Sequence, residues 1–230
     1  MGDERAVFDD LQRTQLPALF EMYGVNCVID VGAHEGEYAK RLRDGGYDGR
    51  IVSFEPVPRA FEALAAEAND DQGWHVHQLA LGRDDGTTTM NVVPGTLSSI
   101  RPPTELGARR YKRLRDPEHV EVSVRRLDAM LDELLDGLDR PRPYLKLDTQ
   151  GFDLDVFAGA GERIRDFAGM QSELPLMQLY EGMPRLPEAL PIYEAAGFDV
   201  AAMYPVSRQG KTGRVLEFDC VMVRGALLKR

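Results

Sequence analysis

Acidic residues stand at the ends of two short apolar segments, each in a position that suits a small ligand. The first segment, residues 25–31, contains Asp30 and runs into a turn with Gly32 and Gly36, and Glu55 follows the second segment. In open parallel sheets, ligands bind at the carboxyl ends of the strands. A carboxylate there can accept hydrogen bonds from both hydroxyls of a ribose. The pattern therefore predicts a nucleoside-binding site.

The spacing of the glycines indicates which nucleoside cofactor the site suits. A dinucleotide site needs Gly-x-Gly-x-x-Gly, so that a pyrophosphate can lie on a helix N-terminus. The loop from Gly32 to Gly36 reads Gly-Ala-His-Glu-Gly, and the carboxylate of Glu35 would face that diphosphate. S-adenosylmethionine has no phosphate and carries a cationic sulfonium and ammonium, for which acidic residues such as Asp30 are suitable. We predict this cofactor, and a tight turn without any ligand is the alternative.

A second group of ionisable residues lies in and after another apolar segment, residues 143–148. Alternate residues of a strand share a face, so Lys146 and Asp148 should point to the same side. Methyl transfer from such a cofactor requires a group that orients the acceptor and, where the acceptor is a hydroxyl, removes its proton. We predict that Asp148 has this role, together with Lys146 and with Glu173 at the end of the next strand.

The same three side chains allow other interpretations. Asp148 and Glu173 could together hold Mg²⁺, a hard ion that prefers oxygen ligands. Lys146 and Asp148 could instead form an internal ion pair that braces the sheet, and Glu173 could be a solvated strand end. The sequence leaves metal dependence open.

The elements that must position these residues alternate between strands and helices. Short apolar runs recur at intervals of roughly 20–25 residues with helical segments between them, a pattern typical of a parallel sheet with right-handed crossovers. The expected strands are residues 25–31, 50–55, 75–80, 87–93, 121–125, 143–148, 170–174, 198–203 and 216–223. The expected helices are residues 6–22, about 36–43, a segment ending near 69, and residues 127–138, 154–161 and 187–196. No helix separates the last two strands, which predicts an antiparallel hairpin in a doubly wound α/β fold.

A chain of 230 residues fits one domain, which we place over residues 1–230 with an N-terminal helix within residues 1–24. Residues 94–118 contain four prolines and are predicted to be a long loop. Residues 101–126 carry eight arginines or lysines against four acidic residues, a local net charge of +4. Long loops in compact domains often cover binding sites.

We predict that this loop is a lid that recruits an acceptor carrying phosphate, sulfate or carboxylate, with Ser98 as a hydrogen-bonding residue before it. A solvated loop whose arginines pair with the acidic surface is the alternative.

Composition excludes several classes of protein. The net charge of −10 disfavours general nucleic-acid binding, because that charge repels phosphate backbones. No stretch approaches the roughly 18 apolar residues of a membrane span, and no apolar signal-peptide core follows the N-terminus. The two cysteines do not make a disulfide framework. We expect a soluble, cytoplasmic protein.

Several ordered motifs resemble one family. Residues 28–36 resemble motif I of class I S-adenosylmethionine-dependent methyltransferases, and more narrowly the FkbM family of O-methyltransferases. Three later segments are similar to that family in the same order: residues 53–56 (Ser-Phe-Glu-Pro), 80–82 (Ala-Leu-Gly) and 145–153 (Leu-Lys-Leu-Asp-Thr-Gln-Gly-Phe-Asp). The resemblance runs from about residue 26 to about residue 223. The family often has Glu-Gly-x-Glu where this chain has Gln-Gly-Phe-Asp at residues 150–153.

The resemblance implies a Rossmann-like class I methyltransferase fold, with a mostly parallel seven-stranded sheet and an antiparallel C-terminal hairpin. It implies that S-adenosylmethionine lies across the ends of the first two strands, with Asp30 and Gly32 at the methionine part, Glu55 at the ribose and Ala80 at the adenine. The residues expected to bind the cofactor are Asp30, Gly32, His34, Glu35, Gly36, Glu55, Pro56, Ala80 and Ser98.

The resulting hypothesis is an enzyme that transfers a methyl group to a hydroxyl of a small molecule or glycan, such as a sugar unit or a polyketide-like metabolite. The first alternative is a catalytically idle nucleoside-binding domain that acts through a protein partner. A nicotinamide-dependent oxidoreductase is the third possibility, and the glycine spacing argues against it. The identity of the acceptor and the oligomeric state are left open.

Overall fold

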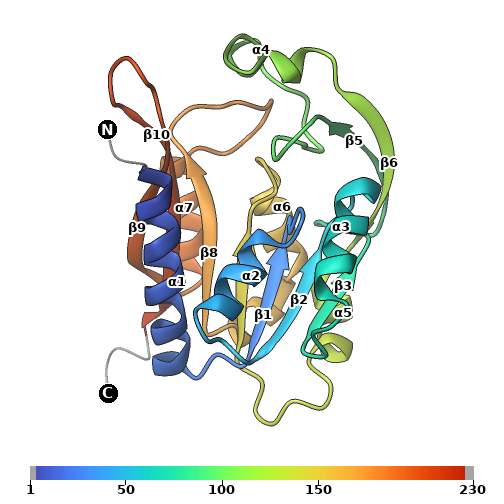
Figure 1. The fold of residues 1–230 in the computed structure, drawn as a ribbon, viewed down its shortest axis with the longest axis vertical. Coiled ribbons are helices and arrows are strands. Elements are labelled where there is room, and N and C mark those ends of the chain that lie inside the picture. Colours follow the sequence, from blue (N-terminus) through green and yellow to red (C-terminus); the bar gives the residue numbers. More distant parts are fainter. Residues whose placement is uncertain (1–3, 226–230) are drawn as a thin grey trace.

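The computed structural model describes the backbone of residues 4–225 and the side chains from residue 14 onward within that range. Seven strands form one sheet in the order β3-β2-β1-β7-β8-β10-β9 (Figure 1). The first five of these are parallel, and β10 runs antiparallel to both of its neighbours. The strands are β1 (Cys27–Val31), β2 (Arg50–Phe54), β3 (Trp74–His77), β7 (Pro143–Leu147), β8 (Gly169–Pro175), β9 (Phe198–Arg208) and β10 (Val215–Arg224). The predicted doubly wound sheet with a C-terminal hairpin is confirmed.

Helices cover both faces of the sheet. One face packs against α1 (Glu4–Tyr23), α2 (Glu37–Asp44) and α3 (Pro58–Ala68), and the other against α5 (Leu127–Leu134), α6 (Asp153–Gly159) and α7 (Leu186–Ala195). Alternation within the strands produces two apolar layers, because Val28 and Tyr144 face the first group of helices while Ile29 and Leu145 face the second. No helix in the described part of the chain has the length and apolar composition required to cross a membrane.

A second, three-stranded sheet stands beside the main one, in the order β4-β6-β5. It comprises β4 (Ala80–Leu81), β5 (Gly86–Val92) and β6 (Glu118–Arg125). The predicted single strand over residues 75–80 is therefore wrong, since β3 ends at His77 and Ala80 already pairs with Val124 in the second sheet. The two segments expected at 87–93 and 121–125 do pair with each other, in the antiparallel direction.

The segment predicted as a loop over residues 94–118, which we call the lid segment, contains regular structure. It includes the helix α4 (Glu105–Arg110) and a 3₁₀ helix, η1 (Lys112–Arg115), and lies above the carboxyl ends of the central strands (Figure 1). The hydroxyl of Thr104 accepts a hydrogen bond from the backbone N–H of Gly107 at 3.0 Å and so caps α4. The expectation of a wholly irregular loop is therefore wrong.

The first residues of the lid segment are hydrogen-bonded to the turn that follows β7. The hydroxyl of Ser99 donates to the carbonyl of Gln150 at 2.8 Å, and Nε of Arg101 donates to the carbonyl of Gly151 at 2.8 Å. The same guanidinium forms an ion pair with Asp155 at 2.7 Å. These contacts fix the position of the lid segment relative to the residues at the end of β7.

Candidate active site

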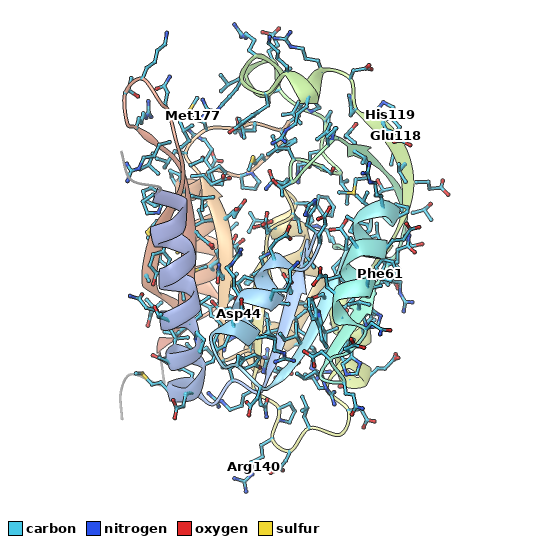
Figure 2. The ribbon with its side chains drawn as sticks, viewed as in Figure 1. Asp44, Phe61, Glu118, His119, Arg140 and Met177 are labelled. Carbon is cyan, nitrogen blue, oxygen red and sulfur yellow. The ribbon has the colours of Figure 1, made fainter. Side chains whose placement is uncertain are left out.

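A cavity of about 980 Å³ opens at the carboxyl ends of β1, β2 and β7. The lid segment and β6 form one of its walls, and β10 forms part of the opposite wall. Glu118 on β6 and Met177 after β8 lie on opposite sides of the space above the central strands (Figure 2). Ten of the residues predicted from the sequence line this cavity: Gly32, His34, Glu35, Glu55, Pro56, Ala80, Ser98, Lys146, Asp148 and Glu173. Two predicted residues, Asp30 and Gly36, do not.

Glu55 is the main acidic residue at the end of the cavity formed by β1 and β2. Its side chain is 5% exposed. One carboxylate oxygen accepts from the backbone N–H of Val57 at 2.8 Å and the other from that of His34 at 2.9 Å. Burial raises the pKa of Glu55, while these two hydrogen bonds oppose the shift. Each oxygen has a further lone pair, so the carboxylate can still accept from a pair of ligand hydroxyls.

Gly32 brings the ends of β1 and β7 together. Its φ is +78°, and a Cβ at this position would lie 2.0 Å from the carbonyl oxygen of Asp148. Only glycine permits that approach. Gly36, also with positive φ, packs against the ring of Trp74. Its role is therefore in packing, and the prediction that it touches the cofactor gains no support from the cavity.

His34 occupies the turn between these glycines with a φ of +50°. Its Nδ1 lies 3.3 Å from a carboxylate oxygen of Glu37, the first residue of α2. This hydrogen bond raises the pKa of His34 and lowers that of Glu37 to about 2. The imidazole is thereby held at the rim of the cavity, and Glu35 beside it is exposed.

Asp30 lies beneath the cavity, where it is fully buried. It is the β-sheet partner of Lys146 across β1 and β7, so the two side chains share a face and come within 3.1 Å. Its other oxygen accepts from the hydroxyl of Ser53 at 3.3 Å. The predicted contact of Asp30 with the methionine part of a cofactor gains no support from the cavity, because Asp30 is fully buried and does not line it.

Lys146 forms the internal ion pair that was the alternative interpretation. Besides Asp30, it lies 3.5 Å from Asp148 and donates to the carbonyl of Gly32 at 3.3 Å. Burial lowers the pKa of this ammonium, but the charges of Asp30 and Asp148 together outweigh burial, so the net shift is upward. Lys146 therefore stays protonated and keeps the carboxylate of Asp148 in place.

Asp148 and Glu173 are bridged by one amide group. Nε2 of Gln150 donates to Asp148 at 3.0 Å and to Glu173 at 3.1 Å. Burial raises the pKa of Glu173 well above its usual range, and the charge of Asp148 adds to this effect. The two neighbouring carboxylates therefore differ: Asp148 has a cation beside it, whereas burial disfavours the charged form of Glu173.

This arrangement does not fit the Mg²⁺ site considered for Asp148 and Glu173. An amide N–H group is a hydrogen-bond donor and cannot ligate a cation, and the ammonium of Lys146 repels one. Within the described residues, the two carboxylates belong to no group of three potential ligand atoms that lie within 4.8 Å of one another.

Two carboxylates that the sequence analysis did not single out line the same cavity: Glu217 and Asp219 on β10. Asp219 is the antiparallel partner of Glu173 on β8, and Nε2 of Gln171 donates to it at 2.6 Å. Burial, with neighbouring carboxylates, raises the pKa of Glu217 to about 8 and that of Asp219 to about 7. The available signal was a pair of acidic residues at alternate positions in an otherwise apolar strand.

We expect Glu55→Ala to weaken the binding of S-adenosylhomocysteine by about 1–3 kcal/mol, the range for hydrogen bonds to a charged group. The reason is that the buried pair of carboxylate oxygens at the end of the cavity formed by β1 and β2 would be lost. Isothermal titration calorimetry measures the change. Glu62→Ala, an exposed carboxylate on α3, is the control and should bind as the unaltered protein does. Equal affinity of the Glu55 variant would rule out the ribose assignment.

The comparisons with known proteins agree with this geometry. The family model for the methyltransferase FkbM domain matches residues 30–199. A 2-O-methyltransferase, NoeI, from Sinorhizobium fredii is 26% identical over 80% of this chain and 76% of its own. Methyltransferase 1 from Beauveria bassiana is 24% identical over 77% of this chain and 74% of its own.

Among solved structures, a S-adenosylmethionine-dependent methyltransferase from Leishmania major superposes with a TM-score of 0.50. It is 11% identical, and the match covers 93% of this chain and 71% of that one. At that identity the likeness concerns the fold alone, which is the Rossmann-like methyltransferase fold. The family match, the two relatives and the fold together show that the chain belongs to the FkbM methyltransferase family.

Proposed function

We propose that this protein is a S-adenosylmethionine-dependent O-methyltransferase that acts on a hydroxyl of a small molecule or glycan. The observation that carries the proposal is the position of Asp148 in the cavity, between the end with Glu55 and the end with Glu173. The similarity to NoeI, described as a 2-O-methyltransferase, supports oxygen as the methylated atom.

The residues present fit S-adenosylmethionine. The cavity is large enough for a nucleoside and an acceptor together. Glu55 would accept from the ribose hydroxyls, Ala80 would border the adenine, and the backbone around Gly32 would border the methionine part. When bound, the cofactor supplies a methyl group made electrophilic by the sulfonium.

Asp148 then performs the proton chemistry. Its carboxylate accepts the proton of the acceptor hydroxyl as that oxygen forms its bond to the methyl carbon. Lys146 and Gln150 position the carboxylate, each from within hydrogen-bonding or ion-pair distance. Glu173, which accepts from the same Gln150 amide group, would orient the acceptor through a hydrogen bond. The lid segment would cover the acceptor during the reaction and exclude water from it.

Titration of the purified chain with S-adenosylhomocysteine tests the proposal, with NADH as the control ligand. We expect micromolar affinity for S-adenosylhomocysteine and no binding of NADH. A chain that binds NADH, or neither ligand, would contradict the cofactor assignment. An idle nucleoside-binding domain would bind S-adenosylhomocysteine but transfer no labelled methyl group to any hydroxyl acceptor.

A further inference from the structure

The end of the cavity beyond Asp148 is acidic. Glu173 projects from β8, and Glu217 and Asp219 project from the adjacent β10. These three carboxylates come from two strands that are hydrogen-bonded to each other, so their spacing is fixed by the sheet. With Asp148 they form four carboxylates that line one continuous space. An acceptor whose hydroxyl reaches Asp148 must lie against this wall.

The cations near this wall do not balance it. Lys146 is paired with Asp30 and Asp148, and the charge of Arg41 acts on Asp219. Glu173 and Glu217 form no ion pair within the part of the chain that the structure describes, and Glu217 has no hydrogen-bond partner there either. Two carboxylates therefore face the cavity with no described cation of the protein within ion-pair distance, although the charge of Lys146 acts on Glu173.

The basic residues of the lid segment do not offset this deficit. The guanidinium groups of Arg110, Arg113 and Arg115 donate to backbone carbonyls, and that of Arg109 pairs with Glu105. Only Arg113 among these four lines the cavity. These guanidinium groups are therefore engaged in structural hydrogen bonds within the segment and to β9, and of the four only Arg113 presents its charge to the cavity, which weakens the argument for an anionic acceptor.

We propose that Glu173 and Glu217 are specificity-determining residues that bind a protonated amino group of the acceptor, next to the hydroxyl that is methylated. The acceptor class is therefore an amino alcohol, in particular an amino sugar unit. An ammonium donates up to three hydrogen bonds and supplies the cation that this wall lacks. A bound ammonium favours the charged forms of Glu173 and Glu217, whereas a carboxylate or phosphate in the same place would disfavour those forms and be repelled by them.

This inference rests on the proposed function and specifies its substrate. The chemical balance is that of O-methylation. The hydroxyl oxygen forms a bond to the methyl carbon as the sulfur–carbon bond breaks, the hydroxyl proton passes to Asp148, and the ammonium keeps its protons. The amino group is a recognition element and is not itself methylated, because its protonated form has no lone pair.

The test uses the full chain saturated with S-adenosylhomocysteine and three sugars of different charge. Glucosamine carries an ammonium, N-acetylglucosamine is neutral and glucuronate is anionic. By calorimetry we expect glucosamine to bind about tenfold more tightly than either of the others. Glu217→Gln, which retains shape and removes charge, should abolish the preference. Glu121→Gln, an exposed carboxylate of β6 outside the cavity, should retain it.

The outcomes separate this inference from the proposed function. If S-adenosylhomocysteine itself does not bind, the proposed function fails. If it binds but glucosamine binds no better than the neutral and anionic sugars, or does not bind, only the present inference is overturned. Glu173→Gln provides a second variant should Glu217→Gln lower the thermal midpoint, and it too must reduce the preference. A preference that survives both substitutions would overturn the assignment of these residues.

Discussion

Replacing Asp148 by Asn is expected to lower kcat for methyl transfer by about 10²–10⁴-fold, the usual contribution of a positioned general base. Asparagine preserves the shape of the side chain and can still accept from Gln150, but it cannot take the proton of the acceptor. Affinity for S-adenosylhomocysteine should change by less than about twofold, since we propose Glu55, and not Asp148, as the ribose acceptor. The result would be a variant that binds S-adenosylhomocysteine normally and turns over far more slowly.

The measurement is transfer of a labelled methyl group to an acceptor that the unaltered protein methylates, combined with titration of S-adenosylhomocysteine. Asp132→Asn is a suitable control, because that carboxylate is exposed, pairs with Arg163 and does not line the cavity. Undiminished kcat in the Asp148 variant would show that the proton leaves by another route. Lost cofactor affinity would show that Asp148 holds the cofactor instead.

The second large effect concerns stability and pH. We expect the free energy of unfolding of the ligand-free protein to receive a penalty from Glu217 that grows between about pH 4.5 and 8. The pKa of this carboxyl rises from its ordinary value of 4.5 to about 8 in the folded chain, because of burial and of the charges of Asp148, Asp153 and Asp219. The folded state therefore binds more protons than the unfolded state in this window.

It follows that stability falls as the pH rises, by at most about 1.4 kcal/mol per pH unit for one group, with solvent screening reducing that slope. Glu217→Gln removes the penalty, so the variant should be more stable than the unaltered protein at pH 8 and nearly equal to it at pH 5. Urea denaturation at pH 5, 6.5 and 8 measures the difference. Glu121→Gln should show none. If the free energies of unfolding of the Glu217 variant and of the unaltered protein changed equally with pH, this carboxyl would have an ordinary pKa in the folded chain.

The sequence was sufficient to predict the main sheet, because each central strand is a short apolar run bounded by glycine or proline. It also predicted that Glu55 and Asp148 would line one cavity, since both follow parallel strands that end at the same edge. The buried position of the Asp30 side chain could not be predicted from the sequence. Only the register of β1 against β7 shows that this side chain faces Lys146 inside the sheet.

The carboxylates of β10 illustrate a second limit of prediction from the sequence. Glu217 and Asp219 lie in the last strand, and they become part of the site because β10 inserts between β8 and β9. Nothing in the local sequence specifies that insertion. The helix α4 could not be predicted for a different reason, since it has only six residues and follows two prolines. Its N-cap residue, Thr104, was the single available indication.

The attachment of the lid segment to the turn after β7 has a consequence for engineering. Ser99 and Arg101 hold the carbonyls of Gln150 and Gly151, and the side chain of Gln150 in turn bridges Asp148 and Glu173. The lid segment and the turn that contacts the proposed base, Asp148, are thus linked by direct hydrogen bonds and should be exchanged together. A chimera that takes only residues 94–118 from a relative would lose the contacts between this segment and the turn after β7. A chimera that also takes residues 150–155 from the same relative would retain them.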